Sequence, residues 1–379
     1  MDARYDVVIV RPYINFPNES AAVDRYWQLR RQLSVAGLSS ALVCSDFHHN
    51  KKEKRAEGVA KFADVYLINS GSYERNISFS RVIFEVAFCI KALFILLKLK
   101  PRCVVIGEPL VGTLFLASIL KVTGVPTVGD FIDLFPETYK FKIRSRLLFS
   151  AVSSPFWLAR WFTARFLYAH AVSVSEDFRK SIGVSAERIT TIYWGGNTVY
   201  GYPMGRCSRV GLIYAGSLGE GYDIELLIAY AEKNPHVPVV IAGDGPKSEL
   251  CKKADLAGTI RFLGSVGPER LTEELSAAAV GVLPYKRGSA VSVPIKFFDY
   301  LSHGLVIVSS LNGEATRIAI DNNIGLAYVA GNLDSFSSAA DLALRMTPDS
   351  TKVTELSKKM LAETQYSEFA LLLRRISQP

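Results

Sequence analysis

A lysine, an aspartate and a histidine recur at helical spacing in the segment SVPIKFFDYLSHGLVIVSS, residues 292–310. A helix places Lys296, Asp299 and His303 on one face, because they stand at i, i+3 and i+7. A lysine in a first helical turn lies at the positive end of the helix dipole, and a bound anion would remove this conflict. Asp299, one turn later, can accept hydrogen bonds from a sugar diol. The pattern indicates a seat for a nucleoside diphosphate, although a surface helix with a Lys296–Asp299 pair explains these residues equally simply.

The flanking residues predict the elements that position this polar stripe. Pro294 suits a first helical position, since its missing N–H has no intrahelical partner to lose. Apolar residues recur at helical spacing up to Gly304, which supplies the stop, so we expect a helix over 294–303. The apolar, β-branched run 305–308 that follows is typical of a parallel strand buried on both faces.

The whole chain repeats this alternation of strands and helices, which predicts a doubly wound α/β protein. The first half is expected to hold strands at 6–10, 40–44, 65–68, 103–106, 126–128, 171–174 and 189–193, with helices at 21–36, 82–98 and 110–123 and a polar loop at 47–58. The second half is expected to hold strands at 211–214, 237–241, 260–263, 280–283, 305–308 and 326–329, with helices at 222–233, 246–256, 267–278, 294–303 and 313–321.

The turn-rich segment 197–209 separates the two series. We therefore predict two Rossmann-like domains, an N-terminal one over 1–197 and a C-terminal one over 198–361. The segment 362–379 is expected to form a helix that crosses back to the N-terminal domain.

Glycine-rich turns follow the predicted strands of the second half. Ligands of such sheets bind outside the carboxyl ends of the strands. The turn after 211–214 carries Gly216, Gly219 and Gly221, which let the backbone approach a phosphate closely. The segment GSVGP after 260–263 is small enough to admit a flat base, and Lys286 and Arg287 follow 280–283. Together these turns indicate a nucleotide.

Three carboxylates cluster in the segment GDFIDLFPE of the first half: Asp130, Asp133 and Glu137. One of them is a candidate base or sugar-orienting group for an acceptor hydroxyl. The alternatives are that Asp133 caps a short helix and that Glu137 is solvated.

The charge of the chain is uneven. Residues 1–200 hold 26 Lys and Arg against 17 Asp and Glu, which gives +9; the rest of the totals of 44 and 36 leaves 18 against 19, or −1. The basic half suits anionic lipid, a pyrophosphate-bearing substrate or nucleic acid, but no regular nucleic-acid-binding signature is present. The five cysteines are scattered and predict neither a metal site nor a disulfide framework, which fits a cytoplasmic protein.

Two apolar stretches raise the question of a membrane. Residues 82–98 contain Glu85 and Lys91 and are short for a span, so they are interpreted as a buried or interfacial helix. Residues 147–168 mix aromatic side chains, among them Trp157 and Trp161, with Arg160 and Arg165. Such a composition is typical of a helix in a membrane interface, and an ordinary core or interdomain helix is the alternative. No signal peptide is evident at the N-terminus.

The chain resembles retaining GT-B glycosyltransferases, the family-4-like (group 1) branch of bacterial surface-polysaccharide biosynthesis. The resemblance rests on GSLGEGYDIELLI, VVIAGDGPKSEL, RLTEELSAAAVGVLPY and PIKFFDYL in this order, and on VPTVGDFIDLFPE in the first half. It implies two Rossmann-like α/β/α domains facing across a central cleft. It further implies that the domain over 1–197 binds the acceptor and the domain over 198–361 binds the nucleotide sugar. The reaction it implies is transfer of a sugar with retention, without a metal or another cofactor, from a nucleotide diphosphate sugar to a lipid-linked or other saccharide acceptor, as in O-antigen or capsule synthesis. The protein would then be cytoplasmic and peripheral at the inner face of the cell membrane.

The resemblance also assigns candidate site residues. The catalytic candidates are Asp130, Asp133 and Lys296; the donor-binding candidates are Gly216, Ser217, Leu218, Gly219, Ser265, Val266, Arg287, Val293, Pro294, Ile295 and Asp299; the acceptor-side candidates are Asn18 and Glu19.

The sequence departs from the family pattern at two points. Asp299 stands where the second glutamate of a pair binds ribose, and Val291 occupies the position of the first. The usual phosphate lysine after the first strand of the second half is missing, so Lys296 and Arg287 are expected to supply its charge. These departures keep two alternatives open, a GT-B sugar-nucleotide epimerase and a non-catalytic nucleotide-binding protein.

Overall fold

The computed structural model of the protein describes residues 5–17, 24–49, 51–55, 62–76, 78–137, 145–197 and 209–378. The chain divides into two compact units, one comprising 1–193 with 365–379 and the other comprising 194–364. The predicted boundaries lie at 197/198 and 361/362, a few residues from the observed divisions.

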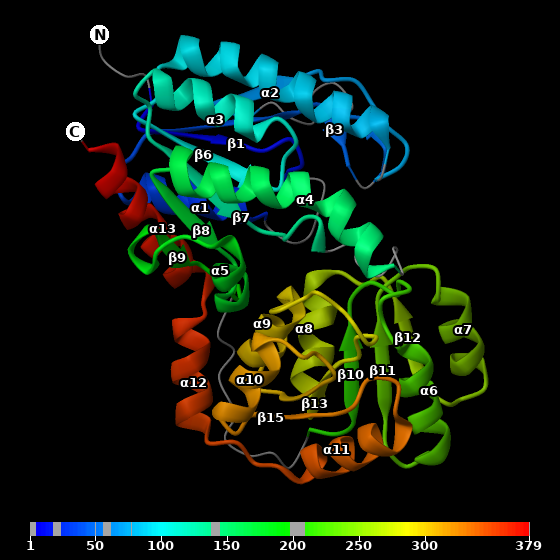
Figure 1. Ribbon diagram of the computed structural model, residues 1–379. Helices are drawn as coiled ribbons and strands as arrows, with labels where there is room; N and C mark the ends of the chain where they lie inside the picture. Colours follow the sequence, from blue (N-terminus) through cyan, green and yellow to red (C-terminus); the bar gives the residue numbers. More distant parts are fainter. Residues whose placement is uncertain are drawn as a thin grey trace. The chain divides into compact units, whose positions relative to one another are not determined.

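The first unit is built on a seven-stranded parallel sheet with the order β5-β2-β1-β6-β7-β8-β9 (Figure 1). The strands are β1 (Val7–Val10), β2 (Ser40–Ser45), β5 (Val65–Ile68), β6 (Cys103–Glu108), β7 (Thr127–Phe131), β8 (His170–Ser173) and β9 (Ile189–Thr191). The order reverses direction at β1 and β6. These two strands are neighbours in the sheet, although β2 and β5 of the same sheet lie between them in the chain. Loops at such a point diverge and leave room for a ligand.

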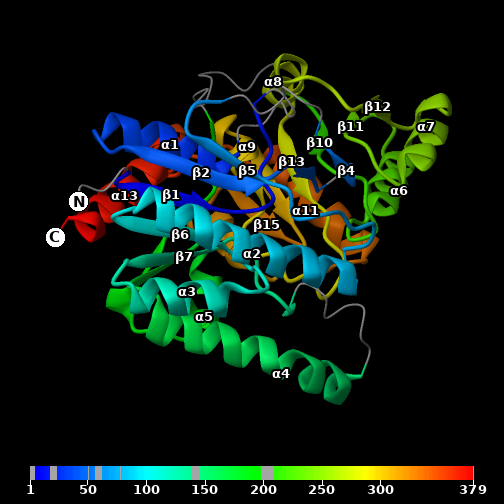
Figure 2. The same ribbon diagram turned by 90° about the horizontal axis from the view of Figure 1, so that it is seen from above.

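The helices of the first unit are α1 (Arg25–Val35), α2 (Phe79–Leu99), α3 (Thr113–Val122), α4 (Arg146–Phe162), the π-helical turn Thr163–Leu167, α5 (Glu176–Ile182), the 3₁₀ turn Ala186–Arg188 and α13 (Ala362–Ser377). Helices α2, α3 and α4 follow one another along one side of the unit (Figures 1 and 2). In the described part of the chain no helix combines the length and the apolarity that crossing a bilayer requires.

The prediction of a polar loop over 47–58 was wrong in part. Within this segment, β3 (Phe47–His48) and β4 (Glu53–Lys54) pair as a small antiparallel sheet. Lys52 adopts a positive φ of 59° at its turn. The two-residue strands are too short to show an alternating pattern in the sequence.

The second unit is a six-stranded parallel sheet with the order β12-β11-β10-β13-β14-β15. Its strands are β10 (Leu212–Ala215), β11 (Val239–Ala242), β12 (Arg261–Gly264), β13 (Val280–Leu283), β14 (Val306–Ser309) and β15 (Gly325–Ala327). In chain order this arrangement is 3-2-1-4-5-6, the order of the dinucleotide-binding fold. The prediction of a doubly wound α/β fold is thereby confirmed.

The helices of the second unit are α6 (Ile224–Lys233), α7 (Ser248–Leu256), α8 (Pro268–Ala277), α9 (Ile295–Ser302), α10 (Glu314–Asp321), α11 (Leu333–Arg345) and α12 (Ser350–Lys359). Each predicted helix of this half overlaps an observed one, whereas α11 and α12 were not predicted. Pro294 is not the first helical residue but the N-cap of α9, since its ψ of 152° is extended. A core of strand residues and apolar residues of α6 and α11 fills one face of the sheet.

Candidate functional site

Two loops of the second unit meet where the strand order reverses. Residues 216–223 follow β10 and residues 284–294 follow the adjacent strand β13. Three contacts tie the loops together: the Asp223 amide donates to the Pro284 carbonyl (2.7 Å), the Lys286 amide donates to the Gly221 carbonyl (2.9 Å), and Tyr222 and Tyr285 form a β-bridge. The ends of β10 and β13 therefore form one structure, at the position where this fold binds ligands.

Helix α9 is fixed to the sheet beneath these loops by Tyr300. Its hydroxyl accepts a hydrogen bond from the Ala215 amide (3.0 Å) and donates to the Val282 carbonyl (3.3 Å). Its ring packs on Gly281, where a Cβ atom would stand 2.5 Å from the ring. Because one buried residue binds α9 to both β10 and β13, the polar residues of α9 are held at the loop junction.

The Lys296 ammonium lies among three tyrosine rings. The distances from Nζ to the ring centroids are 4.5 Å for Tyr214, 3.9 Å for Tyr222 and 5.3 Å for Tyr285. Nζ also donates to the Tyr214 hydroxyl (3.1 Å), and this hydroxyl in turn donates to the Ser217 carbonyl (2.5 Å). We call Tyr214, Tyr222 and Tyr285 the tyrosine cage. It connects the lysine directly to the glycine-rich loop.

Two opposing effects act on the charge of this lysine. Burial lowers the pKa of Lys296 to about 7, and Asp299 acts against this shift. The three aromatic faces also favour the charged form, because their quadrupoles attract a cation. When protonated, Lys296 is thus a cation with unusually little solvation and no carboxylate within ion-pair distance among the described residues. Such a cation gains strongly from a bound anion.

The neighbouring amides divide into those already bonded and those still able to bind. The Gly216 amide donates to the Ala242 carbonyl and the Leu218 amide to the Asp244 carbonyl, both at 2.9 Å. These two amides are therefore not available to a phosphate, in contrast to the prediction for the Gly216–Ser217 backbone. No acceptor is found within the described residues for the amides of Ser217 and Gly219, nor does a side chain cap α9. Together with Lys296 they are candidates for binding an anion.

Asp299 lies one helical turn beyond Lys296. Burial raises the pKa of its carboxyl to about 6, while the nearby lysine lowers it. Its carboxylate has no hydrogen-bond partner among the residues described. His303, the third member of the predicted stripe, instead ends the helix: it is buried, and its Nδ1 lies 2.7 Å from the Asp299 carbonyl oxygen. The stripe is therefore two residues long.

The other predicted donor residues lie at the same edge of the sheet with differing exposure. Ser265 and Val266 directly follow β12, whose last residue, Gly264, accepts a hydrogen bond from the Gly243 amide (2.7 Å). Arg287 is exposed in the loop before α9. Leu218, Val293 and Pro294 are buried, and Ile295 is exposed. Leu218, Val293 and Pro294 thus support the loops from within.

The carboxylates of the first unit have three different environments. Asp130 is completely buried and forms a bidentate ion pair with Arg25 (2.9 and 3.0 Å), which also donates to the Tyr193 carbonyl and the Tyr366 hydroxyl. This ion pair joins β7, α1 and α13 in the core, so Asp130 does not reach the surface as a catalytic candidate should. Glu137 accepts from Arg160 and Trp157.

Asp133 differs from both, since no hydrogen-bond partner of its carboxylate is found in the described part of the chain. It lines a cavity of about 660 Å³ between the start of α2, the loop from β6 to α3, and α4. Burial raises the pKa of Asp133 above its usual value. Of the three clustered carboxylates, it is the one that lines this cavity. Asn18 and Glu19 lie outside the described residues.

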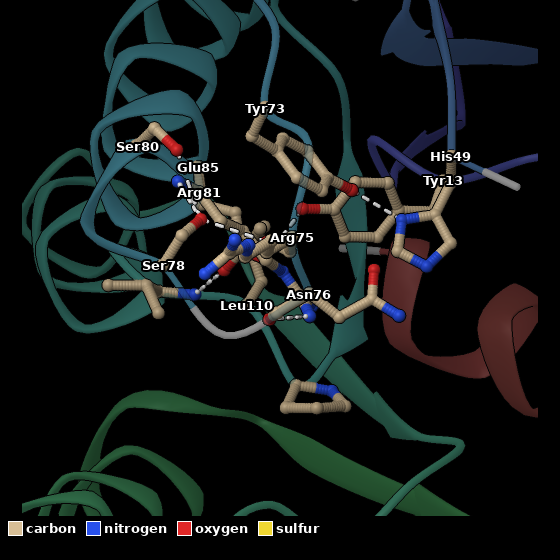
Figure 3. A network of polar contacts seen from close by, with 12 residues as sticks. Tyr13, His49, Tyr73, Arg75, Asn76, Ser78, Ser80, Arg81, Glu85 and Leu110 are labelled. Carbon is tan, nitrogen blue, oxygen red and sulfur yellow. Dashed lines mark hydrogen bonds and ion pairs between the residues drawn. The ribbon is translucent and has the colours of Figure 1, made fainter. Parts of the chain in front are cut away.

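A polar network borders this cavity (Figure 3). Glu85 accepts hydrogen bonds from the Tyr13 hydroxyl (2.6 Å), Arg81 Nε (2.8 Å) and the Val111 amide (2.7 Å). Figure 3 shows Tyr73 beside the same group, where its hydroxyl contacts the His49 ring. The network fixes the start of α2 against the loop after β6. It leaves the remaining cavity wall largely apolar.

Sequence reasoning missed the tyrosine cage. Its members are visible as a tyrosine in β10, in the glycine-rich loop and directly after β13. The predicted strand ends therefore contained the information that these three tyrosines could lie at one edge of the sheet. The convergence of three rings on Lys296 depends on the strand order, which the sequence alone did not predict.

The two units have the architecture of GT-B proteins, which consist of two Rossmann-like domains. WaaB, described as a lipopolysaccharide outer core galactosyltransferase, is similar with a TM-score of 0.66 and 13% identity over 97% of this chain and 99% of that one. HepE from Anabaena in complex with UDP has a TM-score of 0.60 and 12% identity over 98% and 97%. UDP-GlcNAc 2-epimerase from Methanocaldococcus jannaschii has a TM-score of 0.58 and 10% identity over 97% and 99%. At these identities the likeness establishes the fold.

Residues 211–345 match the model of the family described as glycosyl transferases group 1. This match covers about a third of the chain and agrees with the resemblance over the second unit, every strand of which lies within the matched residues. No curated protein matches the chain.

Proposed function

We propose that the protein is a retaining, hexosyltransferase-type glycosyltransferase that moves a sugar from a nucleotide diphosphate sugar to a lipid-linked saccharide acceptor in surface-polysaccharide biosynthesis. The observation that carries the proposal is the caged Lys296 beside free amides at the strand-order reversal of the second unit. Family membership of this unit supports the reaction class.

The donor pyrophosphate binds at the start of α9. Lys296 and the amides of Ser217 and Gly219 stabilise the negative charge that develops on the leaving diphosphate, because donors that the fold holds in place need no reorganisation during the reaction. Asp299 accepts hydrogen bonds from the ribose. The base rests near Ser265 and Val266, and Arg287 adds positive charge from the loop. Because protein groups have the stabilising role in this assignment, we expect full activity in the presence of a chelator.

The acceptor belongs to the first unit. Asp133 orients the acceptor hydroxyl or receives its proton, since its carboxylate is unpaired and lines the cavity. Helices α2, α3 and α4 bring the enzyme to the inner face of the cell membrane. They carry many exposed apolar side chains, and their single acidic residue, Glu85, is buried. Such a surface suits anionic lipid.

Calorimetry with UDP, GDP, dTDP and ADP tests the donor site. One of them is expected to bind at micromolar affinity. Asp299→Ala should weaken this binding by about 1–3 kcal/mol through lost hydrogen bonds to the ribose. Asp321→Ala, an exposed aspartate at the end of α10, serves as the matched control and should bind normally. Unchanged affinity in Asp299→Ala would show that the ribose lies elsewhere.

The fold also accommodates an epimerase, and one of the similar structures carries that name. A transferase is favoured by the exposed apolar faces of α2, α3 and α4, which an enzyme acting only on soluble nucleotide sugars does not need. Incubation with a nucleotide sugar and an undecaprenyl-type acceptor separates the possibilities. A transferase yields a lengthened lipid-linked saccharide, an epimerase yields an isomerised nucleotide sugar, and a non-catalytic protein yields neither.

A further inference from the structure

The exposed apolar residues of α2 form one continuous line. Phe79, Ile83, Val86, Ile90, Phe94 and Leu97 are all exposed, from 37% for Val86 to 78% for Phe79. Their spacing of three or four residues places them on one face of the helix, over a length of about 27 Å at 1.5 Å per residue. We call these six residues the α2 stripe.

The charges beside the α2 stripe are of one sign. Lys91 and Lys98 on α2 and Lys121 on the adjacent α3 are exposed. Helices α3 and α4 contain no acidic residue, and the one in α2, Glu85, is buried in the network beside Arg81. An apolar line flanked by cations complements an anionic lipid surface better than it complements a protein of mixed charge.

The α2 stripe leads into the cavity of the first unit. Phe79, at its N-terminal end, lines the cavity, and so do Val82, Leu114 and Val152, which are exposed as well. The cavity is therefore open along residues of α2, α3 and α4 that also face solvent. The apolar wall continues through Pro155, Phe156 and Ala159 of α4 and Phe131, the last residue of β7.

The cavity is large enough for a ligand and poorly suited to a charged one. About 660 Å³ lies within the range of small-molecule sites. The two cations in its wall are already neutralised, Arg81 by Glu85 (2.8 Å) and Arg160 by Glu137 (2.7 Å). Among the described residues a phosphate therefore finds no unpaired positive charge in the wall, whereas a hydrocarbon chain finds apolar surface to bury.

We infer that this cavity binds the hydrocarbon chain of the lipid-linked acceptor, drawn in from the membrane surface along the α2 stripe. The inference rests on the proposed function for the identity of the acceptor. The part of the chain nearest the head group lies between α2 and α4, and Asp133 at the cavity wall is then close to the attached head group. The site thus selects acceptors by their apolar portion.

Binding of hexyl, heptyl and octyl β-glucoside, measured by calorimetry below micelle-forming concentrations, tests the inference. Affinity should rise by about 4-fold for each added methylene, as expected for burial of that group. Val152→Trp fills the cavity and should weaken octyl glucoside binding by at least about tenfold. Leu158→Trp, on the same helix but outside the cavity lining, is the matched control and should change binding by less than about 2-fold.

Equal affinities across the series, or equal effects of the two tryptophan variants, would overturn the inference. So would a dimer that forms through α2 and excludes the glucosides, detected by sedimentation. Circular dichroism verifies that Val152→Trp folds, and Ala159→Phe provides a second cavity-filling variant. The nucleotide titrations described above are independent of this site. A protein that binds alkyl chains in length-dependent fashion but no nucleoside diphosphate would retain the cavity assignment and lose the proposed function.

Discussion

Removing one ring of the tyrosine cage should weaken nucleotide binding in a pH-dependent way. Tyr222 is the member closest to Lys296, with 3.9 Å between Nζ and its ring centroid. Tyr222→Leu removes the aromatic face but keeps an apolar side chain over the site. Tyr222→Phe keeps the face and removes only the hydroxyl, so it is the matched control.

The size of the effect follows from the cage geometry. A cation–π contact at a partly desolvated site contributes about 1 kcal/mol, which corresponds to about 0.7 pKa units. The pKa of Lys296, about 7 with the cage intact, should therefore fall in Tyr222→Leu. The diphosphate binds the protonated lysine. At pH 8, where deprotonation of Lys296 competes with binding, the affinity of the variant should be about 5-fold weaker than that of wild type. At pH 6, where Lys296 is mostly protonated in both proteins, it should be less than about 2-fold weaker.

Calorimetric titrations between pH 6 and pH 8.5 measure this difference, with wild type compared at each pH so that ionisation of the nucleotide and of Asp299 cancels. Titrations in buffers of different ionisation enthalpy should additionally show proton uptake on binding above pH 7. A loss of affinity that is the same at every pH, or the same in Tyr222→Phe, would refute the role given to the ring face.

Three further predictions concern other parts of the molecule. Gly216→Ala should weaken nucleotide binding by about tenfold, because φ is 148° there and the new Cβ would stand 2.9 Å from Lys296 Nζ; normal binding in calorimetry would contradict this. Asp130→Ala should lower the free energy of unfolding by about 3–5 kcal/mol, since it removes the carboxylate that neutralises the buried Arg25 guanidinium, while nucleotide affinity stays unchanged; a stable variant without activity in denaturant titration and turnover assays would instead restore its catalytic role. Phe94→Glu should reduce flotation with vesicles rich in anionic lipid, and equal flotation of variant and wild type would exclude α2 from membrane contact.

The sequence predicted a feature correctly where a single helix or strand determines that feature. The apolar runs at 280–283 and 305–308 predicted buried parallel strands because such strands are covered on both faces. The α9 segment was predicted to within a residue at each end, since glycine and apolar spacing delimit it. The helix start was misjudged only because Pro294 adopts an extended backbone and serves as the cap.

The sequence was less informative where several elements converge. Asp130 follows a glycine in an acidic segment and looks like a surface carboxylate. Its ion pair with Arg25 spans 105 positions and depends on α1 packing beside β7. Trp157 and Arg160 contributed to the composition that suggested an interfacial helix over 147–168, with a core or interdomain helix as the alternative. Both side chains donate to Glu137, and the exposed residues of α4 are neighbours such as Leu158. Helical spacing identifies faces, but tertiary packing decides which face is covered.

Because α13 returns to the first unit, one unit is continuous in the chain and the other is not. Residues 194–364 form one uninterrupted stretch, whereas the first unit needs residues 365–379 to complete it. Tyr366 and Phe369 place their rings 5.3 and 5.8 Å from the Arg25 guanidinium. A gene fragment for 194–364 therefore encodes all of the groups assigned to nucleotide binding. A stop codon shortly before Gln365, in contrast, would uncover the buried ion pair between Arg25 and Asp130, which lies far from Gln365 in the sequence.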